Sequence, residues 1–99
     1  MRIVAEGPIQ VKEELGGYRH YINDPENRYD IHCGTVIELL QATERDERLV
    51  KGDWIQGRYE GALHKEPPQA YFHFAMAYPS GYELSAPIPL GSIVRLVKD

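Results

Sequence analysis

Hydrophobic and polar residues alternate along much of this chain, as they do in half-buried β-strands. The run IQVKEEL (9–15) places Ile9, Val11 and Leu15 on one side and mostly polar residues on the other. Gly16 and Gly17 follow, and YRHYI begins directly after them. Tight hairpin turns need positive φ at their central positions, which glycine adopts without strain. The pattern therefore predicts a β-hairpin over residues 8–22.

Turn-forming residues divide the chain beyond this hairpin. The runs NDPEN (23–27) and HKEPPQ (64–69) predict loops, because Asn, Asp and Pro favour turns and consecutive prolines cannot donate to a ladder. The charged run ERDER (44–48) predicts the solvated tip of a loop. Periodicity alone leaves TVIELL (35–40) open between a strand and one or two helical turns, and its β-branched residues favour a strand.

The second half of the chain predicts four further strands. The first is DWIQGRYEG (53–61), in which Gly57 predicts a bulge or a sharply coiled corner. In YFHFAMAY (71–78) one face carries Phe72, Phe74, Met76 and Tyr78, and the first three of these are predicted to be core. The turn PSG (79–81) leads into YELSAPI (82–88), and PLGSIVRLVK (89–98) supplies the last strand.

About six short strands without a long helix predict an all-β fold, with room for a minor helix. The expected architecture is one domain over residues 1–99, an SH3-like or related antiparallel barrel with five to six strands. Closing the sheet would remove most of its exposed edges. A chain of 99 residues can bury one core without disulfides or metals.

Composition places the chain among ordinary globular proteins, with 42% hydrophobic and 26% charged residues. Its apolar runs are far shorter than the ~18 residues that span a bilayer. The opening residues MRIVAEGPIQV contain no apolar signal region. The one cysteine, Cys33, cannot form an internal disulfide and suits a reducing compartment. These features predict a cytoplasmic protein that does not insert into membranes.

The formal net charge is −4, and most Lys and Arg residues stand beside an acidic residue. Proteins that bind duplex nucleic acid usually present a basic face, because counterion release from phosphates supplies much of their affinity. General affinity for nucleic acid is therefore disfavoured, although a local basic patch stays open.

Four histidines and the cysteine raise the question of a metal or thiol site: His20, His32, His64, His73 and Cys33. Structural zinc sites usually show paired ligands at short spacing, which this sequence lacks. On a strand, adjacent His32 and Cys33 would point to opposite faces. The sequence therefore predicts no catalytic residue, no metal site and no cofactor. A metal- or thiol-dependent hydrolase is kept as an alternative.

Aromatic residues are the remaining candidates for function, since small barrels bind partners through rim loops and aromatic grooves. The predicted binding residues are Tyr18, Tyr21, Tyr29, Trp54, Arg58, Tyr59, Tyr71 and Tyr82. For Trp54 a core position is favoured over a contact, whereas each tyrosine is open between the two. The leading hypothesis is a non-catalytic module that binds a protein partner. The alternative is a barrel that stacks single-stranded nucleic acid on these rings.

Two stretches, YDIHCGTVIELL and GDWIQGRYEG, resemble a bacterial domain of unknown function, family 5348. The resemblance covers about the last two thirds of the chain and departs from the family pattern at QATERDERLVKGD and at the N-terminal hairpin. The matching positions are His32, Cys33, Gly34, Glu38 and Leu40, then Trp54, Arg58 and Glu60, then Tyr71 and Phe72. The resemblance implies a small bacterial protein of the phage or mobile-element type, and it implies no activity.

Overall fold

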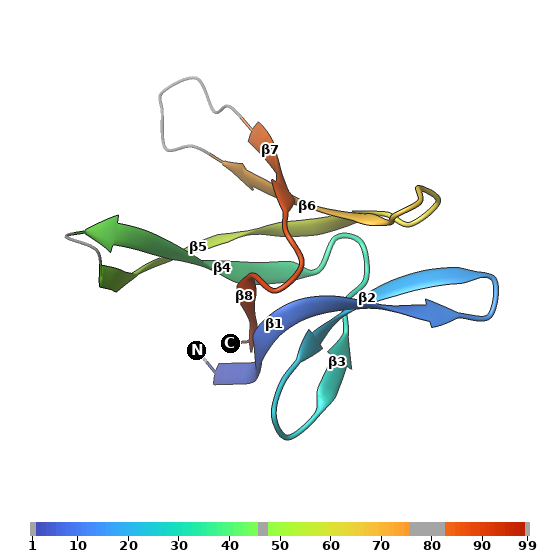
Figure 1. Ribbon diagram of the computed structural model, residues 1–99, viewed down its shortest axis with the longest axis horizontal. Helices are drawn as coiled ribbons and strands as arrows, with labels where there is room; N and C mark the ends of the chain where they lie inside the picture. Colours follow the sequence, from blue (N-terminus) through green and yellow to red (C-terminus); the bar gives the residue numbers. More distant parts are fainter. Residues whose placement is uncertain (1, 46–47, 76–82, 99) are drawn as a thin grey trace.

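The computed structural model describes residues 2–45, 48–75 and 83–98, which form one antiparallel sheet of eight strands (Figure 1). No helix occurs among these residues, so the all-β prediction is confirmed. The strand order in the sheet is β3-β2-β1-β8-β4-β5-β6-β7. The strands are β1 (Arg2–Glu14), β2 (Gly17–Asn23), β3 (Arg28–Asp30), β4 (Val36–Arg45), β5 (Arg48–Ala62), β6 (Gln69–Ala75), β7 (Glu83–Ile88) and β8 (Ile93–Lys98).

The predicted first hairpin is present, with β1 and β2 paired from Ile9↔Ile22 to Glu14↔Gly17. Its turn is one residue earlier than the sequence suggests, because Gly16 rather than Gly17 has the positive φ, at 90°. Leu15 therefore lies in the turn and is fully exposed, instead of sharing the buried face with Ile9. The alternating pattern ends where the turn geometry takes over.

Other strand boundaries differ from the predictions. β1 begins at Arg2, and its first half pairs with β8 rather than with β2. The sequence pattern does not predict the three-residue strand β3, which pairs with β2. The predicted loop tip at 44–48 is shorter, because β4 continues to Arg45 and β5 starts at Arg48. The predicted PSG turn lies outside the described residues.

The sheet curls on itself without closing. Five neighbouring strands, in the order β2-β1-β8-β4-β5, bring β2 and β5 to face each other. The intervening segment 31–35 pairs with both strands in turn: Ile31 N–H donates to His20 C=O, whereas Gly34 N–H donates to Tyr59 C=O. Among the described strands, β2 and β5 are not hydrogen-bonded to each other. The predicted closed barrel is therefore not confirmed, and eight strands replace the expected five or six.

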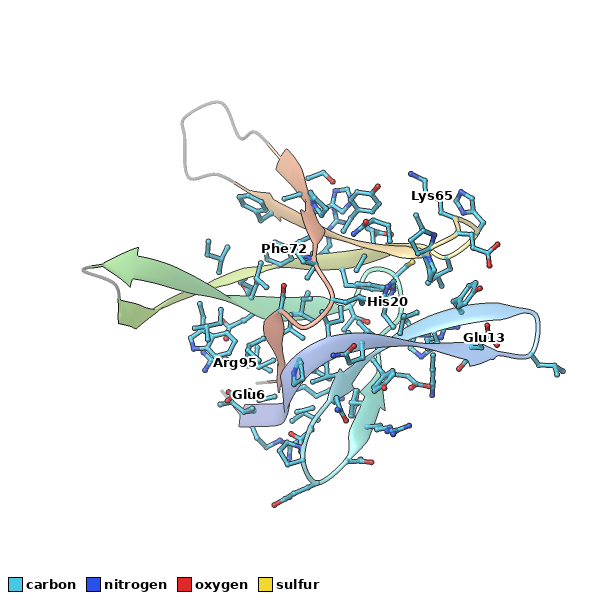
Figure 2. The ribbon with its side chains drawn as sticks, viewed as in Figure 1. Glu6, Glu13, His20, Lys65, Phe72 and Arg95 are labelled. Carbon is cyan, nitrogen blue, oxygen red and sulfur yellow. The ribbon has the colours of Figure 1, made fainter. Side chains whose placement is uncertain are left out.

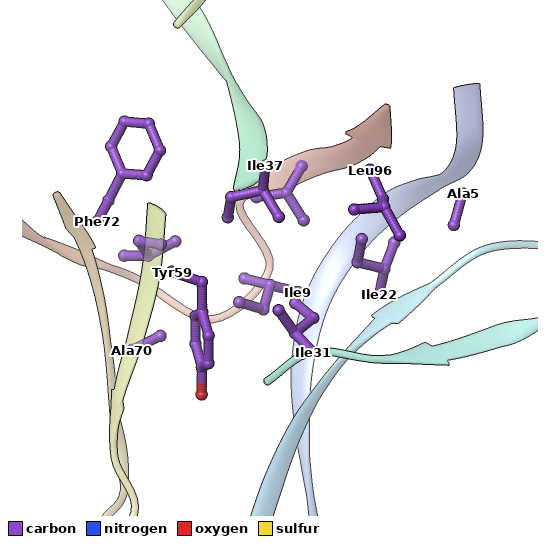
Figure 3. Packing of buried hydrophobic residues seen from close by; sticks show 11 residues of the cluster. Ala5, Ile9, Ile22, Ile31, Ile37, Tyr59, Ala70, Phe72 and Leu96 are labelled. Carbon is purple, nitrogen blue, oxygen red and sulfur yellow. The ribbon is translucent and has the colours of Figure 1, made fainter. Parts of the chain in front are cut away.

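The core lies inside this curl (Figure 3). Its buried apolar residues are Ala5, Ile9, Ile22, Ile31, Ile37, Tyr59, Ala70, Phe72, Ile88, Val94 and Leu96. Apart from Ile31, which follows β3, they occupy alternate positions of their strands, as the sequence pattern predicts.

The predicted core face of β6 is confirmed in part. Phe72 is buried, whereas Phe74 is partly buried and stacks on it with ring centroids 5.4 Å apart. Met76 and Tyr78 lie outside the described residues. Gly57 forms no bulge, since the β4–β5 register is regular there. A Cβ at Gly57 would come 2.5 Å from the Phe72 ring, so glycine leaves room for that ring.

A slot between two hairpins as the candidate functional site

The β1–β2 hairpin and the β5–β6 hairpin project on the same side of the molecule (Figure 1). Between them lies an open groove with a volume of about 440 Å³, which we call the slot. It is lined by residues 14–19 of the first hairpin and by Gly61, Leu63 and His64 of the second. Its volume falls within the ~300–1,000 Å³ that is usual for ligand sites in proteins.

A buried histidine, His20 (Figure 2), and a buried tyrosine, Tyr59 (Figure 3), connect β2 with β5 beside the slot. His20 Nδ1 lies 2.5 Å from the Tyr59 hydroxyl, and both residues are inaccessible to solvent. The rings meet edge to face, with centroids 5.5 Å apart. Among the described residues, His20 Nε2 has no hydrogen-bond partner.

Burial sets the charge state of this pair. Loss of solvation, together with the positive charge of Arg19, lowers the pKa of His20 below its ordinary value. Loss of solvation, together with the nearby Cys33, raises the pKa of Tyr59. Both side chains are consequently neutral at pH 7, and their contact is a neutral hydrogen bond in a dry environment.

A second hydrogen bond crosses the slot. The Tyr18 hydroxyl donates to Glu66 Oε1 at 2.8 Å, joining β2 to the turn that follows β5. This bond and the charge of Glu66 raise the pKa of Tyr18. Because Glu66 is exposed, the bond is accessible to water and can exchange for contacts with a ligand.

The main-chain groups of Tyr18 face the slot on its β2 side. The Ile9 N–H donates to Ser92 C=O, and the Ile9 C=O accepts from Gly91 N–H, just before β8. Because both main-chain groups of Ile9 point toward β8, Ile9 is not hydrogen-bonded to Ile22, its partner on β2. His20 accepts from Ile31 on the β3 side. By the same alternation, Tyr18 directs its N–H and C=O away from β1 and into the slot. No main-chain partner for Tyr18 occurs on this side among the described residues.

The β5 side of the slot has the matching arrangement. Tyr59 exchanges hydrogen bonds with Gly34 and Thr35, so its main-chain groups point toward the start of β4. Gly61, two residues further, points the same way. Its N–H donates to Cys33 Sγ at 3.3 Å instead of to a main-chain carbonyl. The slot thus lies between two strand edges, and segment 31–35 fills only its inner end.

The alternative of metal- or thiol-dependent chemistry finds little geometric support. His32 and Cys33 lie in a turn, where Thr35 N–H donates to His32 C=O, and not on a strand. The exposed Cys33 thiol contacts Gly61, whereas His32 Nδ1 lies 3.3 Å from Arg19 Nη1. Within the described part of the chain, no cluster of three His, Cys, Asp or Glu residues could hold a metal ion.

The predicted aromatic rim does not form one surface. Tyr18 lines the slot, whereas Tyr59 is buried in the core, so the prediction of a rim position for Tyr59 is wrong. Tyr21 is also buried, on the opposite side of β2 from His20, and Tyr29 packs partly buried against the core. Tyr82 lies outside the described residues.

The remaining predicted residues, Trp54, Arg58 and Tyr71, lie on the face of β5 and β6 that points away from the core. The Arg95 guanidinium stacks 4.0 Å from the Trp54 ring centroid and pairs with Glu38 at 2.6 Å. Lys65 Nζ lies 5.7 Å from the Tyr71 ring centroid. Trp54 is half-buried under this ion pair, so the favoured core position for it is wrong.

Sequence reasoning missed the slot residues Leu15 and Leu63. Leu15 was placed on a buried strand face, and Leu63 stood in a predicted loop boundary without a pattern of its own. The slot exists because β2 and β5, which residues 24–47 separate in the sequence, face each other without pairing. The exposed Leu15 beside two glycines was the available local signal.

Comparison with known proteins finds no relative of this chain. No family model, no curated protein and no solved structure matches this sequence. No helix in the described part of the chain is long and apolar enough to cross a membrane.

Proposed function

We propose that this protein is a non-catalytic interaction module that binds another protein through the slot. The observation that carries the proposal is the fully exposed Leu15 at the mouth of the slot, with Leu63 on the opposite wall. An exposed leucine contributes nothing to the core of this chain. Burying it against a partner would contribute about 1.5–3 kcal/mol.

The lining of the slot suits a protein interface. Tyr18 and Arg19 belong to the residue types enriched in such interfaces, and Leu15 and Leu63 add apolar surface. Glu14 and His64 place polar groups at the rim, where charged side chains stay hydrated. Aromatic, arginine and apolar side chains beside hydrated polar groups are a usual composition of recognition sites.

Single-stranded nucleic acid is a second candidate, because Trp54, Arg58 and Tyr71 share one face of the sheet. A base stacking on Trp54 would have to displace Arg95, which is held by Glu38. The slot needs no such rearrangement of an ion pair, so protein binding is the stronger proposal. Titration of labelled oligonucleotides at low salt tests this second candidate, and a flat fluorescence signal would remove it.

Site-specific cross-linking tests the protein-binding proposal. A photoreactive amino acid replaces Leu15, which is fully exposed, so folding should be unaffected. The matched control carries it at Leu90, which is 50% exposed and lies away from the slot, between β7 and β8. A protein cross-linked from Leu15 but not from Leu90 is then purified and its affinity measured directly.

The purified partner should bind Leu15→Asp at least tenfold more weakly than the parent protein, and Leu90→Asp with unchanged affinity. Circular dichroism and thermal melts of both variants confirm that each is folded. Equal weakening by the two substitutions, or cross-linking that does not distinguish the two positions, contradicts a role for the slot.

A further inference from the structure

Two acidic side chains flank the Tyr18 hydroxyl at the slot, one from each hairpin. Glu66, in the turn after β5, accepts the Tyr18 hydrogen bond at 2.8 Å. Glu13 stands directly opposite Tyr18 in the β1–β2 register, so the two side chains lie on the same face of that hairpin. The hydrogen bond to Glu66, together with the negative charges of Glu66 and Glu13, raises the pKa of Tyr18. This part of the slot therefore has a local excess of negative charge.

Neither carboxylate forms an ion pair with a residue in the described part of the chain. Lys65 is next to Glu66 in the sequence, but its Nζ lies 3.4 Å from the Tyr71 hydroxyl and 5.7 Å from the centroid of that ring. Arg19 pairs with Glu14 at 3.5 Å. The cations nearest in sequence to the two carboxylates are thus engaged by other groups, and Figure 2 shows Glu13 on the first hairpin and Lys65 on the second.

Apolar and aromatic surface adjoins the two carboxylates. Leu63 lines one wall of the slot, and Tyr18 and the exposed Leu15 line the other. A long side chain with an aliphatic stem and a positively charged end suits both features, because its stem covers apolar surface while its head group stays with the charges. Lysine and arginine are the two side chains of this kind.

Arginine suits this arrangement better than lysine. Its planar guanidinium has five donors, pairs with carboxylates through two hydrogen bonds and stacks on aromatic rings. The Glu66 carboxylate and the Tyr18 side chain are in direct contact, so one guanidinium can bind the first and stack on the second. A lysine ammonium is a compact and strongly hydrated charge that cannot stack in this way.

We propose that the slot binds an arginine side chain of the partner protein, with the guanidinium between Glu13 and Glu66 and the stem against Tyr18 and Leu63. This inference rests on the proposed function and names the residue that the site recognises. It combines the apolar walls of the slot with charge complementarity. The whole chain has a formal net charge of −4, so long-range attraction also favours a basic segment.

The experiment uses labelled peptides in which a central residue is flanked by leucine on both sides and by serine beyond. The central residue is arginine, lysine, glutamate or citrulline, which keeps the shape of arginine without its charge. Fluorescence anisotropy measures affinity for the full chain, and amide chemical shifts locate the bound peptide. The arginine peptide should bind saturably, with the largest shifts at Tyr18 and Leu63. The citrulline and glutamate peptides should bind about tenfold more weakly or not at all.

Protein variants provide the matched control. Glu66→Gln and Glu13→Gln each remove one charge, and the amide of Glu66→Gln can still accept from the Tyr18 hydroxyl. Each should weaken binding of the arginine peptide by about tenfold. Glu26→Gln removes an exposed charge between β2 and β3, outside the slot, and should leave the affinity unchanged. Thermal melts confirm that all three variants are folded.

Equal binding of the arginine and citrulline peptides in the slot overturns the recognition of a cation but leaves the interaction module intact. Equal weakening by Glu26→Gln and Glu66→Gln has the same consequence, because it indicates an effect of net charge alone. A lysine peptide that binds as tightly as the arginine peptide overturns the choice of arginine. No binding by any peptide overturns the inference, and the Leu15 cross-linking result then decides the proposed function separately.

Discussion

The hydrogen bond between His20 and Tyr59 is the contact whose removal tests the structure most directly. Both side chains are 0% exposed, and His20 Nε2 has no partner among the described residues. In Tyr59→Phe, the imidazole keeps its burial but loses its bond at Nδ1. Leaving a buried polar group unsatisfied costs about 1–3 kcal/mol, so the free energy of unfolding should fall by that amount.

Replacing His20 tests the same hydrogen bond from its other partner. His20→Leu leaves the Tyr59 hydroxyl buried without its partner and should also destabilise the protein. The double variant removes both polar groups and should cost less than the sum of the single variants. We expect a coupling energy of about 1–3 kcal/mol, within the ~0.5–3 kcal/mol usual for residues in contact.

Urea unfolding at pH 7.5 gives these free energies, with the fluorescence of Trp54, the one tryptophan, as the probe. Tyr71→Phe is the matched control, because it removes a half-buried hydroxyl that lies 3.4 Å from Lys65 Nζ. Its effect should stay within about 0.5 kcal/mol, as for most surface substitutions. Additivity of the His20 and Tyr59 variants to within about 0.5 kcal/mol would refute the proposed pairing of β2 with β5 through these rings.

Three further predictions follow from burial and packing. Because folding lowers the pKa of His20, the unfolded chain binds a proton at this residue at a higher pH than the folded chain does. The free energy of unfolding should therefore fall as the pH drops below 6.5, by at most about 1.4 kcal/mol per pH unit. His20→Leu should abolish this slope in urea titrations between pH 6.5 and 4.5. Phe72→Ala should cost about 3–5 kcal/mol and the partly buried Phe74→Ala clearly less, and equal losses in chemical denaturation would contradict the assigned core. Gly7→Ala places a Cβ against the Asn23 carbonyl and should cost about 1–3 kcal/mol, whereas Gly17→Ala meets nothing within 4 Å and should be tolerated; thermal melts compare the two.

Local sequence patterns were sufficient for most of the strands. Alternation in residues 9–14 identified the first hairpin, and the β-branched run at 35–37 correctly favoured a strand for β4. The alternation in β6 placed Phe72 in the core. These features were predictable because a half-buried strand imposes a period of two on its own residues.

Strands whose partners lie far along the chain were harder to predict. β3 has three residues, too few for a period, and depends on β2 for its pairing. The first half of β1 pairs with β8 at the other end of the chain. Local propensity contains no information about such partners, because strand stability depends on the neighbours against which each strand packs.

The candidate site shows the same division. Tyr18 was predicted as a binding residue and lines the slot, but Tyr59, with the same local appearance, is a core residue. A tyrosine has both an apolar ring and a polar hydroxyl, so its type alone does not choose between these roles. Tyr59 can be a core residue because the imidazole of His20, thirty-nine residues away in the sequence, provides a buried hydrogen-bond partner for its hydroxyl.

The sequence by itself determined that this chain forms an antiparallel β-structure with an alternating apolar interior, since hydrophobic periodicity is a property of each strand separately. Only the tertiary structure decided that the ring of strands stays open between β2 and β5. The physical reason is that segment 31–35 leaves β2 after Ile31 and joins β5 at Gly34, so no main chain among the described residues pairs with either strand edge beyond that point. Register and chain path set that opening, and they are fixed by contacts between distant residues.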